Sequence, residues 1–305
     1  MRLHKNPYLI IMRPEHWVKN ILILPGVVLG LNYVSINSKE IFNVLLTLIS
    51  ASLAASANYT INEYLDRAHD SNHPRKKQRV SVLGQVTLKG VVAQYSILYF
   101  FALLIFYSIS TWSFVICLLF MVNALAYNLP NIRLKEKKYL DILSESLNSP
   151  LRLAWGWYSL STIGFPATSA IVSFWLTGIF LMSLKRYVEL SEFSTLAEAK
   201  AYRESLSRYT KQQLLRMSMM AAFSAAMLLG VYITRNRLEF LIILPFVIWI
   251  FTEFTITAVD GGKIIHSPET TIRSPKILVI LITLVISSLF LYLFDIPALS
   301  NFLRQ

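Results

Sequence analysis

Amide, acidic and basic side chains follow one another closely within residues 62–79, directly after an apolar segment. Asn62, Asp66 and Asp70 are four residues apart, so a helix would present all three on one face. Their oxygen atoms are the kind of ligand that binds Mg²⁺. Bases that could hold the phosphates carried by such a metal are Arg75, Lys76, Lys77 and Arg79. The pattern predicts a magnesium–diphosphate site, with Asn62, Asp66 and Asp70 as the metal ligands.

A second polar segment follows Tyr127 and Lys135. Its polar residues recur at helical spacing in an otherwise apolar stretch and are Asp141, Glu145, Asn148 and Arg152. Ionisable side chains within a membrane segment are costly, so their presence indicates a functional site. They are expected to bind a second Mg²⁺ or substrate hydroxyls. In the structural alternative, Glu145 and Arg152 only neutralise each other.

The elements that position these residues are predicted to be transmembrane helices. The mean hydropathy is +0.52 and only 15% of residues are charged, whereas soluble proteins average about 25%. Apolar runs long enough to cross a bilayer lie near 18–36, 41–61, 90–108, 112–129, 142–161, 166–184, 213–233, 238–256 and 277–294. We therefore expect an all-α polytopic protein of about nine spans around a central cavity, forming one integral-membrane domain over 1–305. The single cysteine, Cys117, excludes disulfides. Aromatic residues such as Trp112, Trp155 and Trp157 are expected to anchor the membrane interface.

Lys and Arg are distributed unevenly between alternate loops. With the N-terminus inside and the C-terminus outside, 24 of the 29 basic residues fall on the cytoplasmic side. This asymmetry accounts for the net charge of +12 without a nucleic-acid partner. We expect an integral protein of a bacterial inner (plasma) membrane, with its active site facing the cytoplasm. The long segment 185–211 is expected to form a solvated amphipathic helix.

These motifs together resemble the UbiA superfamily of intramembrane prenyltransferases. The resemblance rests on the Asn-x-x-x-Asp-x-x-x-Asp helix end, its basic continuation and the later Tyr…Lys…Asp-x-x-x-Glu segment. The opening Arg13-Pro-Glu-His-Trp-Val-Lys-Asn20, and the segments 181–186, 207–210 and 267–273, are similar to the polyprenyl-phosphate phosphoribosyltransferase branch. The family's usual Asn-Asp pair is Asn62-Glu63 here.

The resemblance implies Mg²⁺-dependent transfer of a 5-phosphoribosyl group from phosphoribosyl pyrophosphate to a membrane polyprenyl phosphate, with release of diphosphate. Asp66, Asp70, Asp141 and Glu145 are the expected catalytic residues. The expected substrate-binding residues are Arg13, Lys19, Lys76, Arg79, Tyr127, Lys135, Asn148, Arg152, Lys185 and Arg186.

Two other functions are open at this stage. The segment Pro130-Asn-Ile-Arg-Leu-Lys135 is closer to that of family members that use a prenyl diphosphate, which favours prenyl transfer to an aromatic or other acceptor. Buried acids and bases in a polytopic protein are also compatible with an ion-coupled transporter. The acids gather at helix ends rather than at mid-span, which argues against a transporter.

Overall fold

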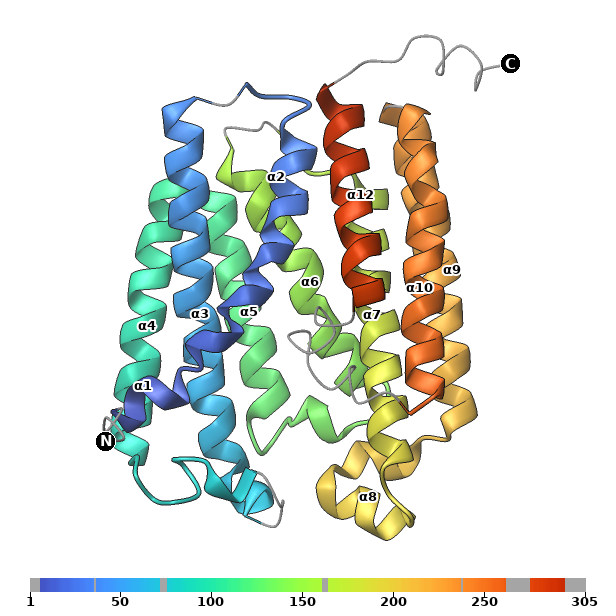
Figure 1. Cartoon of the computed structure of the whole chain (residues 1–305). Coiled ribbons are helices and arrows are strands. Elements are labelled where there is room, and N and C mark those ends of the chain that lie inside the picture. Colours follow the sequence, from blue (N-terminus) through green and yellow to red (C-terminus); the bar gives the residue numbers. More distant parts are fainter. Residues whose placement is uncertain are drawn as a thin grey trace. The chain divides into compact units, whose positions relative to one another are not determined.

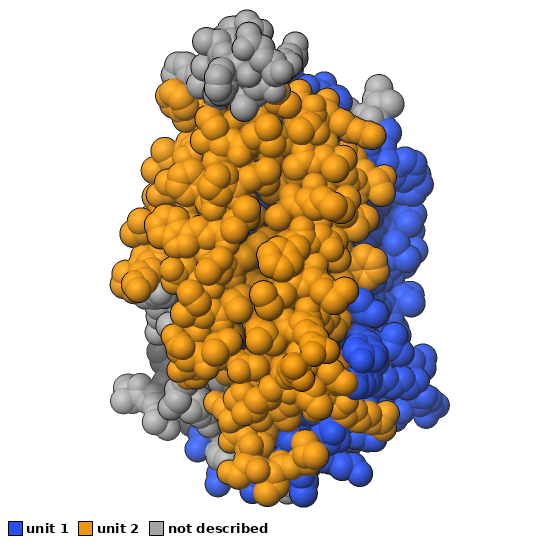
Figure 2. Space-filling model, turned by 90° about the vertical axis from the view of Figure 1, so that its right-hand side faces the viewer, with its two compact units in different colours: residues 1–166, 197–207 blue, residues 167–196, 208–305 orange. Residues whose placement is uncertain are grey.

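The computed structural model describes residues 6–35, 37–71, 76–160, 164–236, 238–261 and 275–293. Every regular element in this part of the chain is a helix, so the predicted all-α class is confirmed there (Figure 1). Arg75 and the 267–273 motif lie outside the described residues. The chain divides into two compact units, residues 1–166 with 197–207 and residues 167–196 with 208–305, which Figure 2 colours separately.

The first unit contains most of the predicted site residues. Its helices are α1 (Pro7–Ile11), η1 (Pro14–Ile23), α2 (Leu24–Gly30), α3 (Ser38–Asp70), η2 (Lys76–Gln78), α4 (Leu88–Ile109), α5 (Thr111–Asn128), η3 (Leu134–Glu136) and α6 (Leu140–Ser159). The unit also includes most of α8 (Leu196–Tyr202) and η4 (Glu204–Arg208). Helices α3, α4, α5 and α6 pack as successive neighbours, and α3 also contacts α5 and α6.

Helix α3 is the longest element, with 33 residues, about 50 Å at 1.5 Å per residue. The side chain of Asn37 caps its first turn by accepting hydrogen bonds from the backbone N–H groups of Lys39 and Glu40. Small buried residues at Ala51, Ala54 and Ala55 let α4 and α5 approach its middle. The helix carries Asn62, Asp66 and Asp70 in its last turns.

Two glycines hold α2 and α6 in backbone contact. A Cβ added to Gly26 would lie 1.8 Å from the carbonyl oxygen of Leu153, and one added to Gly156 would lie 2.0 Å from that of Ile23. Only glycine permits this approach, as at other close helix crossings in membranes. The crossing fixes the middle of α6 against η1, which carries Asn20.

The second unit consists of α7 (Thr168–Ser191), α9 (Lys211–Asn236), η5 (Leu238–Ile243), α10 (Leu244–Val259) and α12 (Pro275–Leu293). Helices α7 and α9 pack along their length, and the Ser173 hydroxyl donates a 2.8 Å hydrogen bond to the carbonyl oxygen of Ala225. The ring of Phe180 packs against that of Phe251, with centroids 4.8 Å apart. This unit is held together chiefly by apolar contacts.

Six described helical segments are long and apolar enough to cross a membrane, namely 38–70, 88–109, 111–128, 168–191, 211–236 and 238–259. Large apolar side chains on them face outward, including Phe100, Tyr107, Met220 and Phe223, as expected of a surface in contact with lipid. The predicted count of nine is not confirmed. The 18–36 run divides into η1 and α2, and α12 contains a shorter apolar stretch, Pro275–Ser288.

The expected interface anchors on α6 lie in the core instead. Trp155 is completely buried between Phe106 and Phe120, and its indole N–H donates to the backbone oxygen of Ser113. Trp157 is also buried, whereas Trp112 is exposed as an interface residue would be. Sequence periodicity did not separate the two roles, because α6 is covered by neighbouring helices on most sides.

Candidate active site

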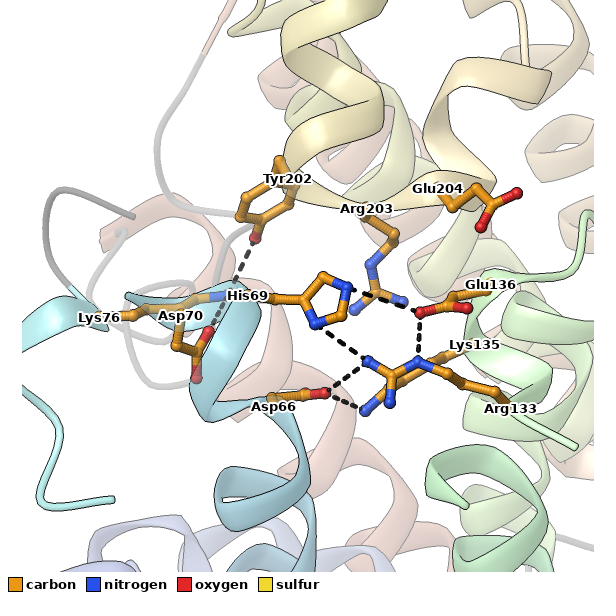
Figure 3. A pocket seen from close by; sticks show the side chains of 10 residues that line it. All are labelled: Asp66, His69, Asp70, Lys76, Arg133, Lys135, Glu136, Tyr202, Arg203 and Glu204. Carbon is orange, nitrogen blue, oxygen red and sulfur yellow. Dashed lines mark hydrogen bonds and ion pairs between the residues drawn. The ribbon is translucent and has the colours of Figure 1, made fainter. Parts of the chain in front are cut away.

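A polar pocket lies in the first unit, where the end of α3 meets the turns of η2, η3 and the α8–η4 segment (Figure 3). Three parts of the sequence far from one another supply its walls: the end of α3 with η2, the η3 turn, and the α8–η4 segment. The lining residues are Asp66, His69, Asp70, Lys76, Arg133, Lys135, Glu136, Tyr202, Arg203 and Glu204. The pocket therefore combines carboxylates, cations and one phenol, which are the groups needed to bind a phosphorylated substrate.

Lys135 is surrounded by oxygen atoms from two helices. Its Nζ donates to Asn62 Oδ1 at 3.2 Å, to Asn128 Oδ1 at 2.9 Å and to Asp66 Oδ1. The residue is only 5% exposed, and burial lowers the pKa of Lys135 to about 8, although the nearby Asp66 carboxylate acts in the opposite direction. Three oxygen atoms thus converge on one buried positive charge.

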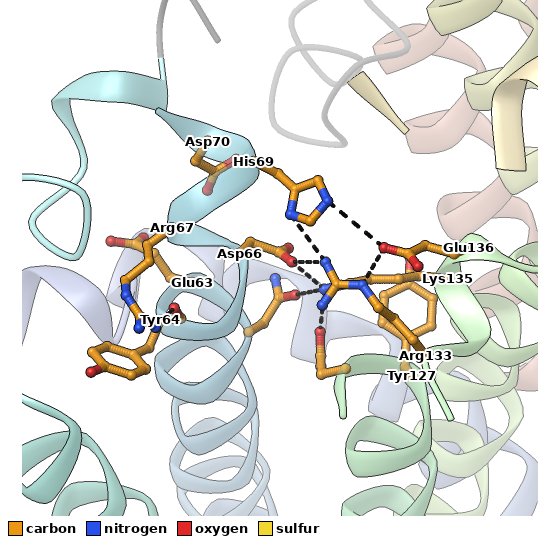
Figure 4. Close-up of polar contacts among 12 residues, drawn as sticks. Glu63, Tyr64, Asp66, Arg67, His69, Asp70, Tyr127, Arg133, Lys135 and Glu136 are labelled. Atoms are coloured by element: carbon orange, nitrogen blue, oxygen red, sulfur yellow. Dashed lines mark hydrogen bonds and ion pairs between the residues drawn. The ribbon is translucent and has the colours of Figure 1, made fainter. Parts of the chain in front are cut away.

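Arg133 brings a second cation to the same carboxylate. Its Nη2 donates to Asp66 Oδ1 at 3.2 Å and lies 3.4 Å from His69 Nδ1, while its Nε pairs with Glu136 (Figure 4). Arg133 has a φ of 37°, in the left-handed region, which is costly for a residue with a side chain and is concentrated at functional sites. The backbone turn aims both Arg133 and Lys135 at α3.

The α8–η4 segment closes another side of the pocket. Tyr202 accepts a 3.4 Å hydrogen bond from Lys76 Nζ, which lies 4.7 Å from the centre of its ring. Arg203 donates to the hydroxyl of Tyr127 at 3.0 Å, and that hydroxyl donates to Glu145 Oε2 at 3.0 Å. A hydrogen-bonded path therefore leads from the pocket to α6. The amphipathic helix predicted over 185–211 is instead the end of α7, the short α8 and η4.

A second ionic cluster lies on the other side of α3, around Glu63. Its carboxylate accepts from Arg13 Nε and Nη2 and from the hydroxyl of Ser81, and it lies 4.0 Å from Arg79 Nε. Arg79 also pairs with Asp70. In Figure 4, Glu63 points away from the side of α3 that carries Asp66. Glu63 therefore ties the N-terminal segment and the turn after α3 to this helix.

Asn62, Asp66 and Asp70 were predicted to share one face of a helix. Asn62 and Asp66 do so, since both contact Lys135. Each four-residue step along a helix advances the side chain by about 40°, so Asp70 has turned away from Asn62. It pairs with Arg79 and lies 3.8 Å from Lys76 Nζ, while still lining the pocket beside Asp66.

The polar stripe of α6 is present, but its members have separate partners. Asp141 is fully buried and accepts a 3.1 Å hydrogen bond from the hydroxyl of Ser205. The amide of Asn148 contacts Asn123, and Arg152 donates to Asn20 Oδ1. Among the described residues, no carboxylate lies within ion-pair distance of Arg152, so the Glu145–Arg152 pair of the structural alternative is not formed.

Lys19, Lys185 and Arg186, which were predicted to bind substrate, are not among the residues that line the pocket. Lys19 Nζ lies 5.9 Å from the centre of the Tyr59 ring. Lys185 and Arg186 belong to α7 in the second unit, where Arg186 is fully buried and pairs with Glu189 at 2.7 Å.

Sequence reasoning left some lining residues without a role. Lys76 and Lys135 were expected to bind substrate, His69 to give hydrogen-bonding support, and Arg203 and Glu204 to lie on a solvated amphipathic helix. No role was given to Glu136, Tyr202 or the supporting Asn128 and Asn20. Asn20 could have been identified from the sequence, because it ends the Arg-Pro-x-x-Trp-x-Lys-Asn opening. In the structure it is buried on the short helix η1. Nothing in the local sequence separates Arg203 from its neighbouring surface charges.

The fold and the pocket define a polytopic helical membrane protein with a pocket lined by charged and polar side chains. The sequence model of the UbiA prenyltransferase family matches residues 23–251, so the chain belongs to this family and is a transferase. It is similar to decaprenyl-phosphate phosphoribosyltransferase of Mycobacterium tuberculosis, with 37% identity over 81 residues. This match spans 25% of the chain and 26% of that relative's length.

Solved structures agree with the family assignment at the level of fold. A UbiA homologue from Archaeoglobus fulgidus bound to GPP and Mg²⁺ matches with a TM-score of 0.71 and 20% identity, covering 94% of this chain and 97% of that one. The apo structure of a UbiA homologue from Aeropyrum pernix K1 matches with a TM-score of 0.65 and 15% identity, covering 91% and 99%.

The pocket also fits the divalent metal found in these relatives. Asn62, Asp66 and Asn128 already direct three oxygen atoms at one cation, the Lys135 ammonium. In the described part of the chain, no three His, Cys, Asp or Glu side chains are placed to share a metal ion. Mg²⁺ characteristically uses one or two carboxylates and completes its shell with substrate phosphates and water. Asn62 and Asp66, with Asp70 beside them, are the residues that would hold it.

Proposed function

We propose that this protein transfers the 5-phosphoribosyl group of phosphoribosyl pyrophosphate to a membrane polyprenyl phosphate. The observation that carries the proposal is the composition of the pocket wall. All ten described lining residues are charged or polar, and the rings among them are the Tyr202 phenol and the His69 imidazole. A sugar diphosphate with hydroxyls and a second phosphate is complementary to such a wall, whereas a prenyl chain requires apolar surface.

The roles follow from the charges around Asp66. In the reaction, the bond between ribose C1 and the diphosphate oxygen breaks, a lipid phosphate oxygen bonds to C1, and diphosphate leaves. Negative charge grows on the leaving group, and Lys76, Arg133 and Lys135 are placed to neutralise it. Mg²⁺, when bound, adds further charge neutralisation there. Asp66 and Asp70 orient these cations and would carry the metal.

The remaining assignments are part of the same proposal. Residues 1–305 form one integral-membrane transferase domain, in an inner membrane, with the pocket facing the cytoplasm where a soluble sugar phosphate is supplied. Asp141 and Glu145 support the site from α6, the latter through Tyr127. Arg13, Lys19 and Arg79 supply positive charge for phosphate groups from the N-terminal segment and the turn after α3. The partial likeness to the mycobacterial phosphoribosyltransferase is consistent with this reaction.

Prenyl transfer is the second candidate, and a specific observation favours it. Arg133 and Lys135, which come from the segment that resembles prenyl-diphosphate users, are the two cations that bind Asp66. The negative charge of a diphosphate alone would balance the positive charges of Arg133 and Lys135. The acceptor would then be an aromatic or other nucleophile and the leaving group would again be diphosphate.

A donor comparison in detergent separates the two. Purified protein with Mg²⁺ is given either labelled phosphoribosyl pyrophosphate with a polyprenyl phosphate, or a labelled prenyl diphosphate with an aromatic acid. The proposal predicts label in the extracted lipid from the sugar donor, and its loss in the Asp66→Ala variant. Product formation only from the prenyl diphosphate would replace the proposed reaction with prenyl transfer.

A further inference from the structure

Arg152 is a buried cation whose charge no described residue balances. It lies in the middle of α6 and is only 6% exposed. Its Nε donates to Asn20 Oδ1 at 3.0 Å and its Nη1 to the backbone oxygen of Asn148 at 3.0 Å, and both acceptors are neutral. The face of the guanidinium lies 5.2 Å from the centre of the Phe120 ring. Burying a charge without a counter-charge is strongly unfavourable, so this arrangement calls for an explanation.

The hydrogen bonds of Arg152 are also incomplete. A guanidinium has five N–H donors, and two are used by the contacts to Asn20 and Asn148, which leaves three on Nη1 and Nη2. The neighbouring amides are engaged elsewhere: Asn20 Nδ2 donates to the Ser52 hydroxyl, and Asn148 Nδ2 to the backbone oxygen of Glu145. Three N–H groups of the positively charged Arg152 guanidinium therefore remain available to bind an acceptor inside the first unit.

We infer that Arg152, held in place by Asn20, is a second anion subsite that binds a phosphate monoester. A guanidinium fork matches two oxygens of one phosphate, and the anion would supply both the charge and the acceptors that the protein does not. The inference rests on the proposed function, whose substrates carry two such groups, the 5-phosphate of the donor and the phosphate of the lipid.

The subsite is separate from the pocket around Asp66 but connected to it. Arg152 is not among the pocket lining residues. Arg203 donates to the Tyr127 hydroxyl, which donates to the Glu145 carboxylate. Asn148 donates to the backbone oxygen of Glu145, and Arg152 to that of Asn148, which completes a polar path between the two. Phe120 and Trp155 form an apolar surrounding next to Arg152. A phosphate attached to an apolar chain has the matching chemistry, which favours the lipid as the source.

The substitution Asn20→Asp tests the inference without removing the arginine. It places a carboxylate at the position of the Asn20 amide, within hydrogen-bond reach of Arg152 Nε, and so supplies the counter-charge from the protein. Unfolding temperature in detergent is measured with geranyl phosphate, with phosphoribosyl pyrophosphate and Mg²⁺, with inorganic phosphate and with 4-hydroxybenzoate. Arg152→Gln is a second variant, and the exposed Arg67→Gln on α3 is the matched control.

We expect a phosphate monoester to protect the wild-type protein and the Arg67→Gln control. In Asn20→Asp and Arg152→Gln the apparent affinity should fall by at least about tenfold, as for loss of a hydrogen bond to a charged group. Both variants should unfold at or above the wild-type temperature without ligand, because the unbalanced charge is gone. Protection by geranyl phosphate identifies the lipid as the source, and protection by phosphoribosyl pyrophosphate alone identifies the donor.

Three outcomes would overturn the subsite. Equal protection of wild type and Asn20→Asp by every phosphate would show that Arg152 does not meet the anion. Protection by 4-hydroxybenzoate only would make the ligand a carboxylate, and protection by inorganic phosphate only would leave no substrate for the site. These outcomes can be told apart from a failure of the proposed reaction, because binding of geranyl phosphate at Arg152 is measured without turnover.

Discussion

Two carboxylates on the last turns of α3, Glu63 and Asp66, are surrounded by similar charges and differ in access. Glu63 pairs with Arg13 and Arg79, and its side chain is 5% exposed. The carboxylate of Asp66 meets Arg133 and Lys135, yet its side chain is 20% exposed and lines the pocket. Ion pairing alone therefore does not distinguish a structural acid from a catalytic one.

The two clusters differ in whether a ligand can replace one of the protein contacts of the carboxylate. The Glu63 cluster is closed, because Arg13 and Ser81 donate hydrogen bonds to one buried carboxylate and Arg79 lies 4.0 Å from it. The Asp66 cluster is open on the pocket side, so a phosphate or a metal ion can replace one protein contact by another. Buried ion pairs favour a fixed geometry, whereas partly exposed ones at a pocket can reorganise around a ligand.

Among the substitutions considered, Glu63→Ala should have the largest effect, and this effect should be on the free energy of unfolding. Removing one partner of a buried ion pair leaves uncompensated charge, so we expect the free energy of unfolding to fall by about 3–5 kcal/mol. Chemical denaturation in detergent measures it, with Glu63→Asp as the control that keeps the charge on a shorter arm. Full stability of Glu63→Ala together with lost turnover would instead assign Glu63 to the chemistry.

Asp66→Ala should act mainly on turnover. Without this carboxylate, Arg133 and Lys135 are no longer held together, and the proposed metal site loses one of its ligands. Activity should drop about 100-fold, equivalent to roughly 2.7 kcal/mol of transition-state stabilisation. Steady-state rates with the donor that proves active measure it, and the unfolding free energy should change less than in Glu63→Ala. Near-normal turnover that EDTA still inhibits would move the metal to other residues.

Asp70→Asn should combine smaller effects of both kinds. Asp70 is buried and paired with Arg79 like Glu63, but it lines the pocket like Asp66. We expect turnover to fall about tenfold and the unfolding free energy by about 1–2 kcal/mol, as for a weakened hydrogen bond to a charged group. Rates and denaturation curves on one preparation measure both. A change in stability alone would group Asp70 with Glu63.

Arg67→Gln should have the smallest effect. Arg67 is exposed, its side chain packs on the ring of Tyr64 at 4.2 Å, and it donates to the backbone oxygen of the same residue. Isolated surface charges contribute little to stability. Turnover and unfolding temperature should therefore match the wild type within error. A clear loss of activity would mean that the charge of this face of α3 contributes to substrate binding.

The sequence by itself determined the class of protein and part of the helix geometry at its candidate site. Hydropathy indicated a helical membrane protein, and four-residue spacing correctly brought Asn62 and Asp66 to one face of α3. The helical stripe of α6 could also be predicted, because it depends only on local periodicity. Hydropathy and helical periodicity can both be read from the sequence without knowing how the helices pack.

Only the tertiary structure decided which charges meet. Asp66 contacts Lys135, which is 69 positions away in sequence, Glu63 contacts Arg13 from the opposite direction, and Arg152 contacts Asn20 over 132 positions. These pairings depend on helix crossings such as the one at Gly26 and Gly156. A helix repeat specifies which residues share a face but not which element covers that face. For the same reason Arg203 became part of the pocket although its sequence context is that of an ordinary surface helix.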